Sequence, residues 1–461
     1  MTIAFGTDGW RAVIADGFTF DNVRIVARAI GVAAGNLSLP AEVDRDVLVV
    51  GFDRRFLSKE FSAVVAEELS AAGFRVLLSD APIPSQCVSH AVKRRGAAGG
   101  VMVTASHNPA IYNGLKFKGW YGGSALPEIY DSIISSLGES SRKPGGSVSE
   151  VSVLEPYVAE LASRLDTAVL RDSGIEILHD PMHGASAGLV ERVVPDANVT
   201  TIRGEINPGF GGVNPEPIPS NLELTMGTVR TGAFDVAICN DGDADRLGIL
   251  DERGDFVSPH QILTLLALDL VRRKGRTGEI VKTFSTTRQL ERLGRALDIP
   301  VHETPIGFKY VAGRMLDHDV LVGGEESGGI GLGDFLPERD GILTGLMVAE
   351  CVAAMNKPLS RIIREMEEEV GPSRYGRRDL QTTAAAVESV IRQVGAGEHD
   401  ALFGTDFESR EQTDGVKLNY SDGTWILFRR SGTEPLIRIY CEAPTQKRVD
   451  ACLERAVGLV E

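Results

Sequence analysis

A short stretch in the first third of the chain carries residues that could perform covalent chemistry. An apolar run at 101–103, bounded by Gly100 and a polar segment, is typical of a buried strand. Ser106 would then lie just past the carboxyl end of that strand, where open α/β sheets form their ligand sites. His107 offers a proton-transfer group beside this hydroxyl, and Lys116 adds a cation. Covalent catalysis requires such a grouping.

An ordinary turn is the alternative interpretation of this stretch, since Ser, Asn and Pro are common turn residues. Short motifs also carry a high risk of false positives. Taken alone, the Ser106–His107 pair favours the turn. Three further polar loops along the chain shift the balance toward chemistry.

The second loop carries three carboxylates at alternate positions, Asp241, Asp243 and Asp245, between two apolar segments. Such a cluster repels itself unless a cation lies within it, and hard divalent ions take oxygen ligands of this kind. An EF-hand fails as an explanation because Arg246 occupies the position that needs glycine. A solvated acidic turn does not explain the buried-looking strands on both sides. The loop therefore predicts a metal site, with Mg²⁺ as the ion.

The third and fourth loops are suited to binding sugars and phosphates. Residues 323–329, GGEESGG, present two carboxylates and a hydroxyl, which can accept hydrogen bonds from sugar hydroxyls. Residues 429–435, RRSGTEP, followed by Arg438, combine arginine side chains, hydroxyls and glycine-exposed N–H groups, the components of a phosphate site. A plain surface turn is the alternative for each loop when it is considered alone.

Length and composition restrict the class of protein. At 461 residues the chain exceeds what one hydrophobic core usually supports, so we expect several domains. Charged residues make up 24% and hydrophobic residues 43%, which is ordinary for a soluble globular protein. The net charge of −16 argues against nonspecific binding to nucleic acid or to an anionic membrane. Five scattered cysteines without a CxxC motif, no signal-like segment at the amino terminus and no long apolar run favour a cytoplasmic protein.

A loose internal repeat suggests how the chain is divided. Segments beginning near residues 47, 175 and 279 each follow the order strand, polar loop, helix, strand, with Ser58, Ser186 and Thr286 or Thr287 as possible helix N-caps. The last segment reads as a hairpin meander closed by a helix. A Gly- and Ser-rich segment at 138–150 reads as a linker. The fold class predicted is three related α/β domains plus a carboxy-terminal α+β domain, with boundaries at 1–145, 151–253, 254–371 and 372–461.

Together the four loops resemble the α-D-phosphohexomutase family. The serine loop TASHNP (104–109), the metal loop DGDADR (241–246), the sugar loop GEESGG (324–329) and the phosphate loop RSGTEP (430–435) occur in the family's order, one in each predicted domain. The resemblance covers nearly the whole chain, because six further segments match: FGTDGWR (5–11), NGLKFK (113–118), DPMHG (180–184), NPEP (214–217), GFK (307–309) and PERDG (337–341).

The resemblance implies a four-domain enzyme around a central active-site cleft, with the following site residues. The catalytic group would be Ser106, His107, Lys116, Arg11 and Arg246. Mg²⁺ would be held by Ser106, Asp241, Asp243 and Asp245. The sugar would contact Glu325, Ser327, Glu326, Lys309 and Gly307. The phosphate that is not reacting would contact Arg430, Ser431, Gly432, Thr433 and Arg438.

The resemblance also implies a reaction: reversible transfer of a phosphoryl group between C1 and C6 of a hexose phosphate. Ser106 would carry the phosphoryl group as phosphoserine, a bound 1,6-bisphosphate would be the intermediate, and glucose 1,6-bisphosphate would act as activator. Either His107 or Lys116 could take the substrate proton. The expected partners are small hexose phosphates, with neither nucleic acid nor membrane, and the protein would be a monomer or a dimer.

The preferred sugar depends on a few residues of the sugar loop. Phosphomannomutases often resemble GEMSGH and phosphoglucosamine mutases GEQSGH, whereas this chain has Glu326 and Gly329. GEES is similar to the phosphoglucomutase group, so glucose 1-phosphate is the predicted substrate. Mannose and glucosamine phosphates are the alternatives. A metal-dependent sugar-phosphate phosphatase and a non-catalytic sugar-phosphate sensor are alternatives from other classes.

Overall fold

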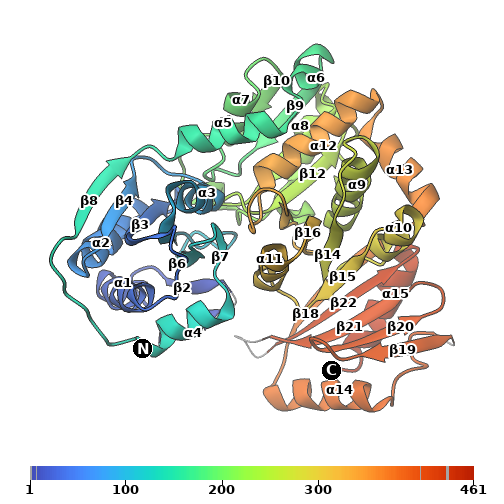
Figure 1. Cartoon of the computed structure of the whole chain (residues 1–461). Coiled ribbons are helices and arrows are strands. Elements are labelled where there is room, and N and C mark those ends of the chain that lie inside the picture. The colour runs from blue at the N-terminus through green and yellow to red at the C-terminus, as the bar shows by residue number, and fades with distance from the viewer. Residues whose placement is uncertain (1–2, 7, 405, 432–435, 461) are drawn as a thin grey trace.

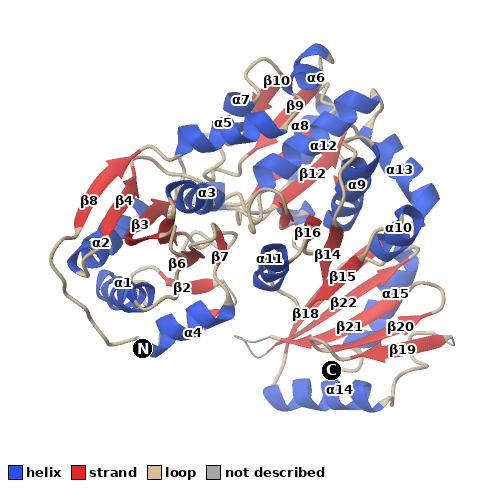
Figure 2. Cartoon of the chain, viewed as in Figure 1, coloured by secondary structure: helices blue, strands red, loops and turns tan. Residues whose placement is uncertain are grey.

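The computed structural model describes residues 3–6, 8–404, 406–431 and 436–460. Figure 1 shows the amino-terminal quarter of the chain on one side of the molecule and the carboxy-terminal segment on another, with the middle of the chain joining them. Within the described residues the strands form four sheets, and Figure 2 shows helices packed on the sheets. This architecture confirms the predicted fold class of three α/β units followed by an α+β unit.

The first sheet has the strand order β1-β2-β6-β5-β3-β4-β8, with β7 paired to β6. Its core strands β3, β5 and β4 are parallel to one another, while β6 runs antiparallel to β5. The strands are β1 (Phe5–Gly6), β2 (Gly9–Val13), β3 (Asp44–Phe52), β4 (Arg75–Ser79), β5 (Ala97–Val103), β6 (Tyr112–Gly119), β7 (Gly123–Ser124) and β8 (Ser147–Val151). The helices are α1 (Phe20–Gly35), α2 (Ser58–Ala71), α3 (Ser85–Arg95) and α4 (Pro127–Ser135).

Strand β8 corrects the linker predicted at 138–150. Ser147–Val151 pairs in parallel with β4 from Arg75–Ser147 to Ser79–Val151. Its side chains are mostly exposed, so the segment has no apolar pattern to mark it as a strand. It becomes a strand because β4 offers an open edge with unpaired backbone groups.

The second sheet has the order β10-β9-β11-β12-β13. β9 is parallel to β10 and β11, whereas β12 returns antiparallel to β11 and leaves a tight loop between them. The strands are β9 (Glu176–Asp180), β10 (Asn198–Thr201), β11 (Val236–Asn240), β12 (Leu247–Asp251) and β13 (Phe256–Val257). The helices are α5 (Leu154–Arg164), α6 (Thr167–Asp172), α7 (Leu189–Val193) and α8 (Glu223–Thr231), with short helices η1 (Phe210–Gly212) and η2 (Pro219–Asn221).

The third sheet has the order β15-β14-β16-β17. Its strands are β14 (Glu279–Thr283), β15 (Val301–Thr304), β16 (Val320–Gly324) and β17 (Ile330–Leu332). The helices are α9 (Pro259–Arg272), α10 (Gln289–Leu297), α11 (Phe308–Asp317), α12 (Gly341–Met355) and α13 (Leu359–Val370). Helix α12 is buried along most of its length and belongs to one continuous apolar core with residues of the first two sheets. This shared core fixes the three α/β units against one another.

The carboxy-terminal sheet has the order β18-β22-β21-β20-β19 and every neighbouring pair is antiparallel. Its elements are β18 (Arg374–Gln381), α14 (Ala384–Ala396), β19 (Phe407–Glu411), β20 (Val416–Tyr420), β21 (Trp425–Arg430), β22 (Leu436–Ala443) and α15 (Gln446–Val457). The hairpin meander and closing helix expected from the sequence are confirmed.

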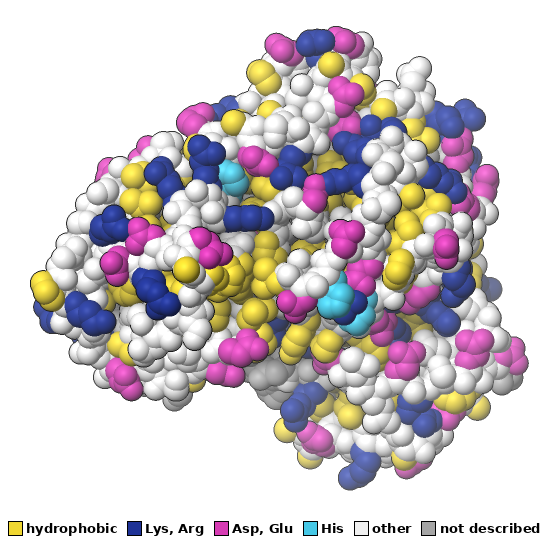
Figure 3. Space-filling model, viewed as in Figure 1, with side chains coloured by type: hydrophobic (Ala, Val, Ile, Leu, Met, Phe, Trp, Pro, Cys, Tyr) yellow, Lys and Arg dark blue, Asp and Glu magenta, His cyan; other side chains and the backbone are white. Residues whose placement is uncertain are grey.

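No single helix in the described part of the chain is long and apolar enough to cross a membrane. Helices α12 and α13 reach that length and composition only as a pair, and the pair is bent by 90°. Figure 3 shows basic and acidic side chains intermixed over the face in view.

Candidate active site

Ser106 lies where the sequence predicts, just beyond the carboxyl end of β5. It is 1% exposed, and its backbone has a φ of 53°, a left-handed conformation that is uncommon for a residue with a side chain. Its Oγ donates a hydrogen bond of 2.7 Å to Asp241 Oδ2 and lies 3.4 Å from His107 Nδ1. The serine loop and the metal loop, 135 residues apart in sequence, therefore meet at this hydroxyl.

A buried arginine, Arg55, holds the serine loop in this conformation. Its guanidinium donates to four backbone carbonyls of the loop, Ser106 O and Asn108 O at 2.6 Å, Pro109 O at 3.0 Å and Tyr112 O at 3.2 Å. Asp53 pairs with Arg55 at 3.3 Å and accepts from Thr104 Oγ1 at 2.6 Å. One buried ion pair therefore connects the end of β3 to the strained turn at Ser106, because β3 and β5 are parallel neighbours.

Replacing Arg55 with methionine should remove the guanidinium donor from these carbonyls and the counter-ion from the Asp53 carboxylate, which would keep only the hydroxyls of Thr104 and Ser58 as side-chain partners among the described residues. Breaking a buried ion pair in this way costs about 3–5 kcal/mol. We expect Arg55→Met to lower the apparent free energy of unfolding in urea by that amount and to reduce the phosphorylation of Ser106. The matched control is Arg54→Met, because within the described residues Arg54 donates a single hydrogen bond, to Gly204 O. Equal stabilities of the two variants would contradict this positioning role.

The three aspartates of the metal loop are buried together between β11 and β12. One carboxylate oxygen from each of Asp241, Asp243 and Asp245 lies within 4.8 Å of the other two. Asp243 Oδ2 accepts from Ser85 Oγ at 2.5 Å and from Lys116 Nζ at 2.9 Å. Asp245 Oδ2 lies 2.9 Å from Lys116 Nζ and 2.8 Å from the Arg339 guanidinium.

The cluster is suited to a divalent cation on two grounds. Asp243 Oδ1 and Asp245 Oδ1 are buried and have no hydrogen-bond donor among the described residues, so both remain available as ligands. Four carboxylates, those of the three aspartates and of Asp8, lie close together here. Two cationic side chains, Lys116 and Arg339, contact this group, so negative charge is in excess. A hard cation with oxygen ligands would balance this excess. Burial and the neighbouring carboxylates of Asp245 and Asp243 raise the pKa of Asp241 well above its ordinary value.

The two candidate proton carriers differ in their surroundings. Burial tends to lower the pKa of Lys116, but the carboxylates of Asp243, Asp245 and Asp8 outweigh burial and raise it. Lys116 Nζ is therefore a fully paired ammonium group. Burial, followed by the positive charges of Arg246 and Arg11, lowers the pKa of His107 well below its ordinary value.

The remaining predicted catalytic residues lie around His107. Arg246 Nη2 is 3.5 Å from His107 Nε2, and Arg246 Nη1 donates to Glu216 Oε1 at 2.9 Å. Arg11, on β2 opposite Gly114 of β6, donates to Asn108 Oδ1 of the serine loop at 2.7 Å. The structure thus brings all five predicted catalytic residues and the three aspartates into one connected group.

The sugar loop joins this group through one of its carboxylates. Glu325 follows β16, and its Oε2 is 3.5 Å from Arg339, which also contacts Asp245 and Asp8. Burial is the main cause that raises the pKa of Glu325 to about 7. Gly329 stands where the loops GEMSGH and GEQSGH have histidine. A side chain at this position would clash with Arg339, because its Cβ would lie 2.4 Å from Arg339 Cδ.

The other predicted sugar contacts have no recorded contact with the serine and metal loops within the described residues. Glu326 Oε2 accepts from Ser285 Oγ at 2.6 Å. Gly307 precedes α11 with a φ of 130°, and Lys309 Nζ lies 5.3 Å above the Tyr310 ring. Ser327 is half-buried at the loop tip. Their roles in sugar binding stay predictions.

The predicted phosphate loop is only partly described. Gly432 and Thr433 lie outside the described residues. Arg430 pairs with Glu388 at 2.8 Å, and both side chains are exposed. Arg438 Nε lies 3.6 Å from Asp379, and the Ser431 N–H donates to Leu436 O at 3.1 Å. The phosphate-binding role of this loop likewise stays a prediction.

Sequence reasoning assigned no role to Arg55, Asp53, Asp8, Ser85 or Arg339. A signal was available for Asp53 and Arg55, since a polar segment follows a buried strand parallel to the serine strand and both loops meet at one sheet edge. Arg339 stands in PERDG (337–341), but nothing in its spacing places it beside the metal loop.

Comparisons with known proteins agree with this geometry. Four models of phosphoglucomutase/phosphomannomutase domains match the chain: alpha/beta/alpha domain I at 2–143, domain II at 155–254, domain III at 258–370 and the C-terminal domain at 377–459. A phosphoglucosamine mutase of Acidothermus cellulolyticus is 31% identical, over 99% of this chain and 95% of the relative.

Solved structures show the same similarity over the whole chain. A "putative phosphomannomutase" from Thermus thermophilus is 38% identical, with a TM-score of 0.87 and 99% of each chain covered. A phosphoglucomutase from Paramecium shares the fold at 19% identity, with a TM-score of 0.84 and coverage of 99% of this chain and 94% of that one. With its serine loop, aspartate cluster and sugar loop joined in one site, this chain belongs to the α-D-phosphohexomutase family of enzymes.

Proposed function

We propose that the protein moves a phosphoryl group reversibly between the C1 and C6 hydroxyls of a hexose phosphate, with Ser106 as the covalent carrier. Phosphorylated Ser106 would give its phosphoryl group to the free hydroxyl, which loses a proton, and a bound 1,6-bisphosphate would form. After the bisphosphate turns over, its other phosphoryl group would return to Ser106 Oγ. Each transfer breaks one P–O bond and forms another, so the enzyme ends as it began.

The observation that carries this proposal is the contact of Ser106 Oγ with Asp241, beside two aspartates that each have a buried oxygen without a donor in the part of the chain that the structure describes. Asp241, Asp243 and Asp245 would hold Mg²⁺ together with an oxygen of phosphorylated Ser106. Bound there, Mg²⁺ would neutralise charge on the phosphoryl oxygens, which is the main requirement of phosphoryl transfer. A phosphatase would need the same aspartates, but not the sugar loop that Arg339 connects to them.

We assign the proton of the attacking hydroxyl to His107 rather than Lys116. His107 Nδ1 is the ring nitrogen facing Ser106 Oγ, at 3.4 Å, so it borders the space that an attacking hydroxyl must enter. Lys116 Nζ forms ion pairs with three carboxylates. Because these carboxylates occupy its three N–H donors, Lys116 is not oriented to exchange a proton with the substrate. Lys116 would instead supply fixed positive charge beside the phosphoryl group.

For the sugar, glucosamine and mannose phosphates now have better support than the glucose phosphate predicted from the sequence. The relatives from Acidothermus cellulolyticus and Frankia casuarinae, both 31% identical, are named phosphoglucosamine mutases. The Thermus thermophilus structure bears a phosphomannomutase description. Phosphoglucosamine mutases resemble GEQSGH and so differ from this chain at Glu326, but a carboxylate at this position would bind the ammonium group of glucosamine more strongly than a neutral hydroxyl.

A direct assay tests both the reaction and the sugar. The protein is incubated with Mg²⁺, a trace of the matching 1,6-bisphosphate and, in turn, glucosamine, mannose and glucose 1-phosphates. We expect 6-phosphates, with the highest kcat/KM for glucosamine or mannose. Release of inorganic phosphate alone would identify a phosphatase, and no conversion of any of the three would contradict the proposed function.

Exchange of Glu326 for methionine tests the role of the sugar loop. Losing a charged hydrogen-bond partner costs about 1.5–3 kcal/mol of transition-state binding, which lowers kcat/KM by roughly 10- to 150-fold. We expect Glu326→Met to lower kcat/KM for glucosamine 1-phosphate by this factor, and to lower it less for mannose 1-phosphate. Glu369→Met is the control, because Glu369 pairs with Arg272 on the outside of α13. An unchanged ratio of the kcat/KM values for the two sugar phosphates would mean that another residue sets specificity.

A further inference from the structure

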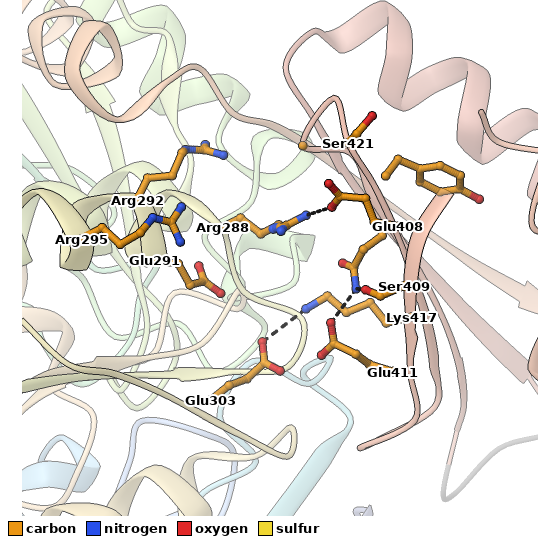
Figure 4. Close-up of a pocket in the computed structure, with 13 residues that line it drawn as sticks. Arg288, Glu291, Arg292, Arg295, Glu303, Glu408, Ser409, Glu411, Lys417 and Ser421 are labelled. Carbon is orange, nitrogen blue, oxygen red and sulfur yellow. Dashed lines mark hydrogen bonds and ion pairs between the residues drawn. The ribbon is translucent and has the colours of Figure 1, made fainter. Parts of the chain in front are cut away.

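A polar pocket, separate from the candidate active site, lies between the third α/β unit and the carboxy-terminal sheet. Figure 4 shows it, with α10 and β15 forming one side and β19 and β20 the other. Its volume is about 380 Å³, within the range of small-molecule sites. Its lining residues belong to none of the loops of the candidate active site.

Three arginines line one wall of this pocket. Arg288 comes directly before α10, and Arg292 and Arg295 follow at helical spacing, so the three share one face. Figure 4 shows them on the α10 side, with Ser421 across the pocket on the carboxy-terminal side. Arg288 has a distant carboxylate partner, Glu408 at 3.7 Å.

The carboxylates of the pocket are already committed to other groups. Glu303 pairs with Lys282 at 3.1 Å and with Lys417 at 3.3 Å, and Glu291 pairs with Lys282 at 2.5 Å. Glu411 accepts from Asn419 Nδ2 at 2.5 Å. These carboxylates are therefore paired with lysines or with an amide, while Glu291 Oε2 is buried without a hydrogen-bond partner among the described residues, so carboxylate oxygens remain for a ligand.

Arg292 and Arg295 have no carboxylate partner within the described residues. Arg292 Nε donates to the backbone oxygen of Val370, which leaves its two terminal nitrogens without a recorded acceptor among those residues. Burial lowers the pKa of Arg292, so its charged form is poorly solvated where it lies. Arg288 and Arg295 repel the charge on Arg292, and the carboxylates of Glu442 and Glu291 oppose that repulsion without forming an ion pair with Arg292 among the described residues. A bound anion would relieve the repulsion further.

We propose that this pocket binds a small phosphorylated molecule that carries several hydroxyl groups. The phosphate would lie against Arg292 and Arg295, because a guanidinium fork matches phosphate oxygens in charge and geometry. The hydroxyl groups would donate to the carboxylates of Glu411 and Glu303. Such a ligand touches α10 and the carboxy-terminal sheet at once, so its binding stabilises their contact. The pocket is separate from the site of the proposed function, which does not depend on it.

Arginine footprinting tests the site directly. The protein is treated with phenylglyoxal at increasing concentrations of ribose 5-phosphate, and modification of each arginine is read by peptide mass spectrometry. We expect saturable protection of Arg292 and Arg295, and none of Arg361, which is exposed on α13. Inorganic phosphate lacks hydroxyl-bearing carbons, so the same protection should require a phosphate concentration at least about tenfold higher than that of ribose 5-phosphate. Absence of protection at Arg292 and Arg295 overturns the site, and equal potency of the two probes overturns the role of the hydroxyl groups.

A double variant provides the second measurement, with Arg288 as a reporter in the same pocket. In Arg292→Gln/Arg295→Gln, protection of Arg288 should need at least about 100-fold more ribose 5-phosphate, since two charged contacts are lost. Mutase activity without the probe should stay at the wild-type level, because neither arginine contacts the serine or metal loops. In the control variant Arg361→Gln, ribose 5-phosphate should protect Arg288 at the same concentrations as in wild type. Protection of Arg288 at unchanged concentrations in the double variant would overturn the proposal.

Discussion

Ser106→Ala is expected to reduce mutase turnover by at least about 10⁴-fold, because the change removes the atom that carries the phosphoryl group. The fold should persist, since the lost hydroxyl donates one hydrogen bond, to Asp241, and Arg55 holds the loop through backbone carbonyls. Intact-mass measurement should find one phosphate on wild type after incubation with the 1,6-bisphosphate, and none on the variant.

A control separates loss of chemistry from loss of structure in this experiment. Ser62 is another fully buried serine, and its Oγ donates to the Lys59 carbonyl within α2. Ser62→Ala should keep both the phosphate and the turnover. Turnover near the wild-type rate in Ser106→Ala would exclude a covalent serine intermediate.

Asp243→Asn should lower kcat/KM by at least about 100-fold, because it removes one of the three charges that would hold Mg²⁺. It also removes the charge that faces Lys116 Nζ at 2.9 Å. Addition of Mg²⁺ should raise the thermal unfolding midpoint of wild type, since a ligand that binds only the folded state stabilises it. The variant should show a smaller rise or none.

Chelation gives a test that needs no variant. Excess chelator should abolish wild-type turnover, and Mg²⁺ should restore it. The control for the substitution is Asp255→Asn, because Asp255 is an exposed carboxylate beyond the other end of β12. Full activity in chelator, with no metal bound, would refute the metal assignment.

The reacting centre was predictable because its residues stand in short motifs at strand ends. Ser106 follows β5, and Asp241 begins the loop between β11 and β12, as the apolar runs on either side indicated. Strand ends of open sheets are where ligand sites form, so local patterns sufficed there. In the carboxy-terminal sheet the strands β20, β21 and β22 and the closing helix α15 were predictable for a similar reason, because the strands are largely apolar and a Ser-Asp-Gly turn separates the first two. Strands β18 and β19 carry mostly polar side chains and were not predicted.

Contacts between distant segments were not predictable from these patterns. Lys116 and Arg339 each contact both Asp245 and Asp8, although these residues come from separate parts of the chain. Only the packing of the three α/β units places them together. Strand β8 was missed because its pairing depends on a free edge of β4 rather than on its own side chains.

All three predicted helix N-caps were wrong: Arg288, not Thr286 or Thr287, is the residue that precedes α10, and the other two differ for local reasons. Ser58 is the first residue of α2, and its hydroxyl bonds Asp53 instead of capping the helix, while Leu57 precedes it with a φ of 60°. Ser186 lies before Gly188, the residue that precedes α7, and its Oγ is 3.4 Å from His179 Nε2. In both places a buried polar partner competes with the helix N-terminus for the serine hydroxyl.

The phosphoryl group on Ser106 should pass directly to the sugar. This transfer is tested most directly by labelling the enzyme at Ser106 with radioactive phosphate, removing free label, and mixing it with unlabelled glucosamine or mannose 1-phosphate for a single turnover. We expect the label to leave Ser106 and to appear in the sugar 1,6-bisphosphate and 6-phosphate. Label that stays on the protein while product forms, or that appears only as inorganic phosphate, would contradict direct transfer.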